Sequence, residues 1–139
     1  MIAYFDASAF LKLAIDEDGS EAAHETWLVA QRRISSHLLY PEARAGLARA
    51  RRMSRIGNRE LARARETVEE YISDVDLVDV TETVTRDAGE LAERYGLRAH
   101  DAVHLATVAG VADESTVLVA TDAELVRAAR AHGITTAAL

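Results

Sequence analysis

Four acidic residues stand where carboxylates do chemistry in α/β proteins. Asp6 follows an apolar run and Asp122 follows a β-branched one, while Glu42 and Asp101 open stretches rich in alanine and leucine. Ligands of a parallel sheet bind outside the carboxyl ends of its strands, so we expect these four side chains to converge. Carboxylate oxygens in a chain without cysteine suit a hard cation. The sequence therefore predicts a site for Mg²⁺ or Mn²⁺ at this edge of the sheet.

Each acid also has a purely structural interpretation. Asp6 and Asp122 each precede a predicted helix, where aspartate is a common N-cap. Glu42 and Asp101 fall in first helical turns, where the helix dipole favours a negative charge. Capping explains each acid singly. It does not explain why all four fall at one edge of the predicted sheet, and that coincidence favours a shared site.

Two histidines, His100 and His104, flank Asp101. A histidine pair four residues apart on a helix can bind zinc, but Asp101 stands where a zinc protease helix carries its catalytic glutamate. We therefore interpret both histidines as hydrogen-bonding or surface residues.

Strands and helices alternate along the chain. Strands are expected at residues 2–5, 33–36, 77–80, 115–120 and 134–137, from short apolar or β-branched runs. Helices are expected at residues 7–15, 20–30, 38–54, 58–73, 83–95, 99–110 and 122–132, from helical propensity and apolar spacing. This alternation predicts an α/β fold, a three-layer α/β/α sandwich with a mostly parallel central sheet.

Length and composition restrict the kind of protein. A chain of 139 residues without a linker or repeat predicts one domain, residues 1–139. No apolar stretch approaches the roughly 20 residues of a membrane span. The N-terminal region lacks the marks of a signal peptide, so we expect a cytoplasmic protein with no membrane association. The absence of cysteine excludes disulfides, zinc–thiolate sites and a cysteine nucleophile.

The charge is unevenly distributed. A net charge of -7 argues against indiscriminate binding to nucleic acid. Between residues 44 and 65, however, only Glu60 opposes a run of arginines: Arg44, Arg49, Arg51, Arg52, Arg55, Arg59, Arg63 and Arg65. This run is either a solvated helix face or a nucleic-acid contact. A neighbouring metal site favours a phosphodiester substrate, with Arg49, Arg52 and Arg55 as predicted RNA contacts.

The ordered motifs of the chain resemble those of PIN-domain ribonucleases, and most of all the VapC toxins of bacterial toxin–antitoxin pairs. The resemblance rests on Asp6-Ala7-Ser8-Ala9 with Lys12, Glu42 in a Tyr-x-Glu context, Asp101-Ala102-x-His104-Leu105-Ala106, and Thr121-Asp122-Ala123-Glu124-Leu125. It covers nearly the whole chain, in the order and at the length typical of that group.

This resemblance implies roles for the acids. Asp6, Glu42, Asp101 and Asp122 would form the acidic quartet of a Mg²⁺-dependent (or Mn²⁺-dependent) endoribonuclease. Asp6 and Asp101 would ligate the metal directly, and Glu42 and Asp122 would do so directly or through water. The metal would activate a water that hydrolyses the RNA phosphodiester bond.

The same resemblance implies supporting residues and partners. Ser8 would be the hydroxyl after the first acid. The family commonly has threonine two residues before its last acid, whereas here Ala120 holds that place and Thr121 is adjacent to Asp122. The substrate would be single-stranded or looped RNA, and the products would carry a 5′-phosphate and a 3′-hydroxyl. A cognate antitoxin, its C-terminal segment lying over the acidic site, and a homodimer are expected.

Two other interpretations remain open from the residues. A receiver-type Mg²⁺-binding signalling domain would need adjacent acids after the first strand, whereas Asp6 has no acidic neighbour and Asp101 opens a helix. A catalytically silent PIN-like module would bind a partner protein without cleaving RNA. The complete quartet argues against the silent module.

Overall fold

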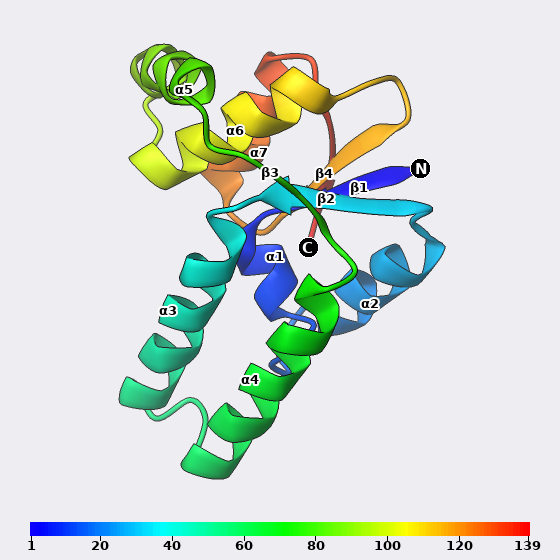
Figure 1. The fold of residues 1–139 in the computed structure, drawn as a ribbon, viewed down its shortest axis with the longest axis vertical. Helices are drawn as coiled ribbons and strands as arrows, with labels where there is room; N and C mark the ends of the chain where they lie inside the picture. The colour runs from blue at the N-terminus through cyan, green and yellow to red at the C-terminus, as the bar shows by residue number, and fades with distance from the viewer.

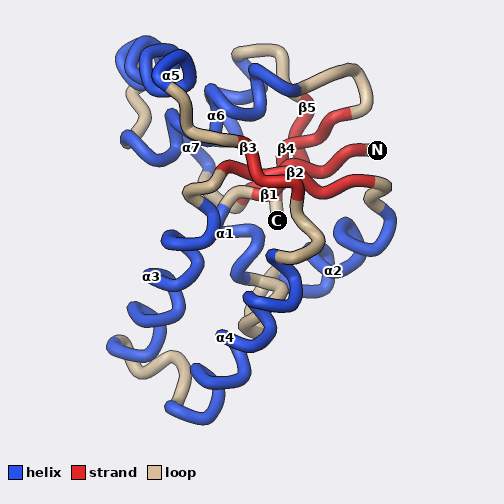
Figure 2. The backbone as a smooth tube through the Cα atoms, in the orientation of Figure 1, coloured by secondary structure: helices blue, strands red, loops and turns tan.

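A five-stranded parallel sheet forms the centre of the molecule in a computed structural model that describes residues 1–139 (Figures 1 and 2). Its strands are β1 Ile2–Phe5, β2 Arg32–Ser36, β3 Asp76–Val78, β4 Thr116–Ala120 and β5 Thr135–Ala138. They lie in the order β3-β2-β1-β4-β5, and every neighbouring pair is parallel. The predicted α/β sandwich and all five predicted strands are confirmed, with small shifts at their ends.

Seven helices cover the two faces of this sheet. They are α1 Ala7–Leu11, α2 Ser20–Val29, α3 Leu39–Arg52, α4 Asn58–Ile72, α5 Glu82–Tyr95, α6 Ala99–Val111 and α7 Ala123–Ala131. Helices α1 to α4 lie on one side of the strands and α5 to α7 on the other (Figure 1). None of them is long and apolar enough to cross a membrane.

Alternation along β1 divides the interior into two cores. Ala3 and Phe5 point into the core shared with α1 to α4, while Tyr4 points into the core shared with α5 to α7. Successive side chains of a strand face opposite sides of a sheet, so a central strand covered on both faces must be apolar at every position. The run Ile2-Ala3-Tyr4-Phe5 meets that requirement, and it fixes where the chain reaches Asp6.

The strand order creates a crevice beside β1. The chain leaves β1 for β2 across one face, and it comes back to β4 across the other face through α5 and α6. Connections that diverge in this way leave the carboxyl ends of the two adjacent strands uncovered, which is where α/β proteins bind ligands. Asp6 follows β1 and Asp122 nearly follows β4. Because α6 delivers the chain to the start of β4, its own first turn lies at this same edge and brings Asp101 there.

The first helix is shorter than predicted. The expectation of a helix over residues 7–15 is wrong beyond Leu11, where α1 ends. The backbone N–H groups of Lys12, Leu13 and Ala14 donate to carbonyls three residues earlier, which tightens the chain into turns. The Lys12 ammonium then holds the following loop through Glu17. The helix thus ends in tight turns that are joined to the following loop by a contact that no local propensity encodes.

Helices α3 and α4 form an antiparallel arm that projects from the body (Figures 1 and 2). The arm is held by small and aliphatic side chains, among them Leu47 of α3 and Val68 of α4, both buried. Gly46 allows α3 to pass close to α1, because a Cβ at this position would collide with the end of the Leu11 side chain. The arm is therefore seated on α1 at its base.

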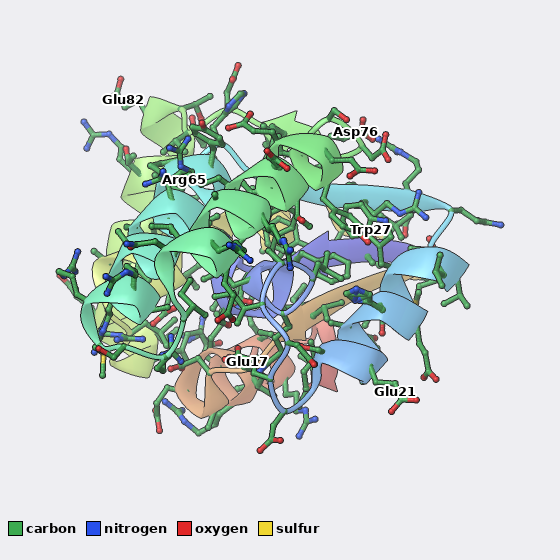
Figure 3. The ribbon with its side chains drawn as sticks, turned by 90° about the horizontal axis from the view of Figure 1, so that it is seen from below. Glu17, Glu21, Trp27, Arg65, Asp76 and Glu82 are labelled. Carbon is green, nitrogen blue, oxygen red and sulfur yellow. The ribbon has the colours of Figure 1, made fainter.

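Trp27 of α2, labelled in Figure 3, contacts aromatic rings from three other elements of the core on the α1 to α4 side. Its ring centroid lies 5.4 Å from that of Phe5 in β1 and 4.8 Å from that of Tyr71 in α4, both in edge-to-face geometry. The Phe10 ring of α1 is 6.2 Å away. The Arg33 guanidinium covers the outer side of the indole at 5.1 Å. Aromatic contacts of this kind add to the area that the indole buries.

We expect Trp27→Ala to lower the free energy of unfolding by about 3–5 kcal/mol, because it removes a large buried ring and leaves a cavity. Its neighbour Leu28 is 78% exposed, so Leu28→Ala is a matched control expected to cost about 0.5 kcal/mol or less. Urea unfolding followed by far-UV circular dichroism measures both. Equal losses in the two variants would show that Trp27 does not organise this core.

Candidate active site

A polar cavity of about 320 Å³ lies at the crevice between β1 and β4. All four predicted acids line it, and they arrive from four places: the end of β1, the first turn of α3, the first turn of α6 and the start of α7. The full lining is Asp6, Ser8, Glu42, Arg98, His100, Asp101, His104, Thr121, Asp122 and Ala123. Residues that span the whole chain thus meet at one point of the fold.

Asp6 is the most deeply buried of the acids, at 3% exposure. It caps α1, since one carboxylate oxygen accepts the Ala9 backbone N–H at 2.8 Å. The Ser8 hydroxyl lies 2.8 and 2.7 Å from its two oxygens. Burial raises the pKa of Asp6 to about 6, and the charge of Asp101 adds to the rise against the opposing hydrogen bonds. The capping interpretation is therefore correct for Asp6, and the carboxylate still lines the cavity.

Glu42 is held by a buried histidine. His104, only 1% exposed, lies with Nε2 2.8 Å from Glu42 Oε1 and with Nδ1 2.9 Å from the Tyr4 hydroxyl. The prediction that His104 is a hydrogen-bonding residue is confirmed. His100 is exposed, with its Nε2 3.6 Å from a carboxylate oxygen of Asp101.

Arg98 joins the remaining two acids. Its Nε lies 3.1 Å from Asp101 and its Nη2 3.3 Å from Asp122, so one guanidinium bridges the starts of α6 and α7. Asp122 also caps α7 by accepting the Leu125 backbone N–H at 2.9 Å. Two of the four negative charges are therefore balanced by one positive charge within the cavity.

Thr121 contributes its backbone to the site. Its N–H donates to the Ser8 hydroxyl oxygen at 3.3 Å, which ties the end of β4 to the start of α1. The Thr121 residue lines the cavity beside Asp122. The supporting pair predicted from the sequence, Ser8 and Thr121, thus lies together next to Asp6.

The types of side chain in the cavity suit a hard divalent cation, because they include four carboxylates and no thiolate. As they stand, no three acidic or histidine side chains are placed to ligate one ion. The four carboxylates do not converge on one point because each of them is directed at a hydrogen-bond donor of the protein. A cation shared by Asp101 and Asp122 would require Arg98 to release them.

The three arginines predicted to contact RNA lie outside the cavity, on the arm. Arg49 and Arg52 are exposed on α3 and form no ion pair. Arg55, in the loop between α3 and α4, lies 3.6 Å from Glu17. Glu42 and Arg49 are seven residues apart on α3, so they share one helix face about 10 Å apart along the axis.

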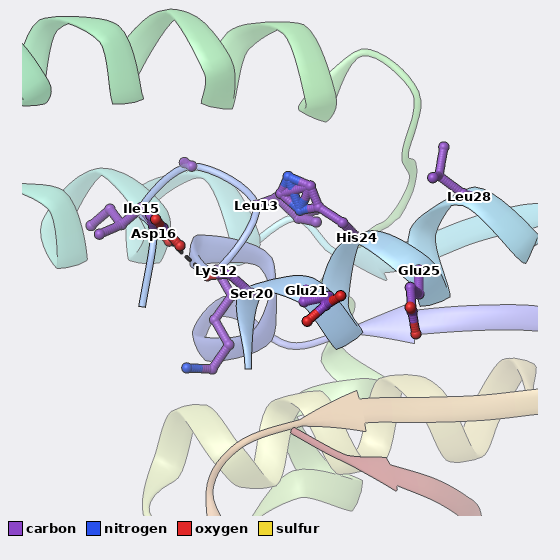
Figure 4. A pocket seen from close by; sticks show the side chains of 10 residues that line it. Lys12, Leu13, Ile15, Asp16, Ser20, Glu21, His24, Glu25 and Leu28 are labelled. Carbon is purple, nitrogen blue, oxygen red and sulfur yellow. Dashed lines mark hydrogen bonds between the residues drawn. The ribbon is translucent and has the colours of Figure 1, made fainter. Parts of the chain in front are cut away.

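A second cavity, of about 560 Å³, lies between α2 and the loop that follows α1 (Figure 4). Leu13, Ile15 and Leu28 give it an apolar component, and Nδ1 of His24 is buried beside it without a hydrogen-bond partner. None of the four predicted acids lines it. Although larger, it lacks the buried carboxylate and the linked donors that mark the polar cavity.

The sequence did not predict Arg98, His100 or His104 as lining residues of the polar site, nor Tyr4 as a residue behind it. The two histidines were interpreted only as hydrogen-bonding or surface residues. Arg98 precedes α6 by one residue and stands three residues before Asp101, a spacing that is itself a signal for an ion pair. Tyr4 was assigned only to a buried strand. Nothing local identifies its hydroxyl as a partner of His104, because the two residues are 100 positions apart.

Comparison with known proteins places the chain in a family. Residues 3–131 match the PIN domain family. Ribonuclease VapC45 of Mycobacterium tuberculosis is 42% identical over 132 residues, which cover 95% of this chain and 92% of the relative. The solved structure of VapC20 from M. tuberculosis, a sarcin-ricin loop cleaving toxin, has a TM-score of 0.72 at 19% identity and 96% coverage of each chain.

A further solved structure has the same fold. VapBC-5 from M. tuberculosis, a member of the VapBC family of toxin–antitoxin systems, has a TM-score of 0.65 at 16% identity and covers 99% of this chain and 98% of its own. The family match spans both ends of the polar cavity, from Asp6 to Asp122. The sequence and fold together therefore show that this chain belongs to the PIN domain family, in its VapC group.

Proposed function

We propose that this protein is a metal-dependent endoribonuclease that acts as the toxin of a toxin–antitoxin pair. The observation that carries the proposal is the meeting of four carboxylates, from four separate elements, around one polar cavity. Its ribonuclease relative at 42% identity supports RNA as the substrate. The fold shared with VapBC-5 supports a cognate antitoxin as the partner.

The acids would hold Mg²⁺ or Mn²⁺, with Asp6 and Asp101 as direct ligands and with Glu42 and Asp122 acting directly or through water. When bound, such a cation lowers the pKa of a water molecule and neutralises charge at a reacting phosphate. The protein's own share is to orient the carboxylates and to keep Asp6 away from bulk water. Ser8 and the backbone of α1 fix Asp6 in the required orientation.

Arg98 would act as the counter-ion of the metal-free site. It balances Asp101 and Asp122 while no divalent charge is present. Its side chain is 67% exposed, so it can leave the two carboxylates without disturbing the core. A released guanidinium at the mouth of the cavity would suit a phosphate oxygen of the substrate.

The arm would hold the substrate away from the reacting bond. Phosphate contacts position a nucleic acid without reading its sequence, and exposed arginines make such contacts well. Arg49 lies on the same face of α3 as Glu42, so an RNA strand leaving the cavity along this face would meet it. The homodimer expected from the resemblance stays a prediction.

We expect Asp6→Asn and Asp101→Asn each to reduce RNA cleavage roughly 100-fold or more, because each removes a metal ligand. EDTA should stop the wild-type reaction, and Mg²⁺ or Mn²⁺ should restore it. Asp87→Asn, an exposed acid on α5 outside the cavity, is the matched control and should retain activity. Full activity of either site variant, or cleavage in EDTA, would refute the proposal, and a complete lack of wild-type cleavage would favour the silent module.

Stability should depend on pH through Asp6. Its folded pKa, about 6, exceeds the ordinary value of 3.8, so the folded state binds more protons than the unfolded state between these values. The metal-free protein should therefore lose stability as pH rises from about 4 to 6, by up to about 3 kcal/mol, and change little from this source above pH 6.

Asp6→Asn should lack this loss and melt higher than wild type in EDTA at pH 7, since asparagine also caps helices well. Thermal melts from pH 4 to 7.5, with Asp87→Asn as control, measure the difference. Saturating Mg²⁺ should raise the wild-type melting temperature and leave the Asp6→Asn variant nearly unchanged. If the stability of wild type and of Asp6→Asn changes with pH in the same way, then the pKa of Asp6 is not raised by folding.

The triple variant of Arg49, Arg52 and Arg55 to Gln should bind single-stranded RNA more weakly. Each lost phosphate contact should reduce the logarithmic salt slope by roughly 0.7. The control makes the same change of charge outside the arm, by replacing with Gln three exposed arginines of α5 and α7: Arg86, Arg94 and Arg130. This control should leave the salt slope nearly unchanged. Fluorescence anisotropy of labelled RNA, titrated at a series of salt concentrations, measures the salt slope of binding for each variant. Identical slopes in the two triple variants would remove the arm from RNA binding.

A further inference from the structure

A buried chain of hydrogen bonds connects three elements behind the polar cavity. It runs from the Tyr4 hydroxyl of β1 to Nδ1 of His104 in α6, and from Nε2 of His104 to Glu42 in α3. Building on the proposed function, we propose that His104 is a positioning residue. It holds the Glu42 carboxylate in the orientation that a divalent cation needs, and Tyr4 sets which ring nitrogen of His104 faces Glu42 as a donor.

The direction of each hydrogen bond follows from the groups involved. An ionised Glu42 carboxylate only accepts, so Nε2 of His104 must carry a hydrogen. In the tautomer that carries its hydrogen on Nε2 alone, Nδ1 is an acceptor and takes the hydrogen of the Tyr4 hydroxyl. Burial raises the pKa of Tyr4, which keeps the phenol protonated as a donor. The chain of bonds therefore has one consistent direction, from β1 to the cavity.

Glu42 needs such support more than Asp6 and Asp122 do. Asp6 and Asp122 are each fixed by a backbone N–H within their own cap, at 2.8 and 2.9 Å. Glu42 has a longer side chain, and its only side-chain hydrogen bond is the one to His104. Without that contact the carboxylate would sample several rotamers on the α3 surface, and ordering it on a cation would cost side-chain entropy.

The other assignment for His104 is simple core packing. The Tyr4 and His104 rings meet edge to face, with centroids 5.8 Å apart. The molecule contains a matched pair that makes the comparison possible: Tyr95 and His132 also meet edge to face, at 5.9 Å, and the Tyr95 hydroxyl lies 3.1 Å from Nδ1 of His132. That second pair contacts no carboxylate of the cavity. His104 is buried and His132 is only partly buried, so the two differ in their expected effect on stability. If packing were the whole role of His104, neither histidine would affect cation binding in a folded variant.

Mn²⁺ affinity, measured by isothermal titration calorimetry on the full chain, tests the assignment. His104→Leu should weaken Mn²⁺ binding about 10- to 100-fold, the usual cost of losing the partner of a metal ligand. His104→Gln, whose amide can donate from nearly the position of Nε2, should recover most of the affinity, and the shorter His104→Asn should not. Tyr4→Phe should weaken binding less than His104→Leu does. His132→Leu, the matched control, should bind as wild type does.

Melts in EDTA identify any variant that fails to fold, and the His104→Gln and His104→Asn pair keeps the test decisive if His104→Leu is lost. Asp6→Asn, titrated alongside, separates the two proposals. If wild type does not bind Mn²⁺, or if Asp6→Asn binds it equally well, then the metal site itself is wrong. If wild type binds and Asp6→Asn does not, while the folded His104 variants bind as wild type does, then only the positioning role of His104 is overturned.

Discussion

The burial of one carboxylate at the end of the central strand is the constraint on which the site depends. Asp6 follows β1, which is paired on both sides, so its carboxylate lies deep in the crevice at the strand end and is only 3% exposed. A buried charge is tolerated only with hydrogen bonds or an opposite charge beside it. The first turn of α1 and the Ser8 hydroxyl supply the hydrogen bonds. The remaining parts of the site are arranged around this fixed group.

The other three acids show how a protein can gather negative charge without unfolding. Arg98 balances two of them, and the His104 ring binds the third. Each of these partners comes from α6 or from the residue that precedes it, so a single helix organises most of the cavity. The site is therefore already assembled as protein, with its carboxylates held near one another but not yet directed at a common point.

The sequence predicted the parts of this arrangement that depend on local pattern. Buried parallel strands require apolar runs, and the residues that end them, such as Asp6 and Asp122, fall at a shared edge by topology. The contacts among side chains were beyond such reasoning. Arg98 reaches Asp122 across 24 positions, and Tyr4 reaches His104 across 100. Those distances along the chain carry no periodic signal, and only the packing of α6 against the sheet brings the partners together.

The seating of α3 on α1 has a mechanical consequence. Glu42 stands near one end of a continuous helix whose other end carries the exposed arginines, and Gly46 rests against Leu11 between them. A helix of this length behaves nearly as a rigid unit. Gly46, at its contact with Leu11, is the point about which α3 would turn. A load applied at the tip of the arm would be transmitted to the carboxylate of Glu42, whose opposite tether is the buried imidazole of His104.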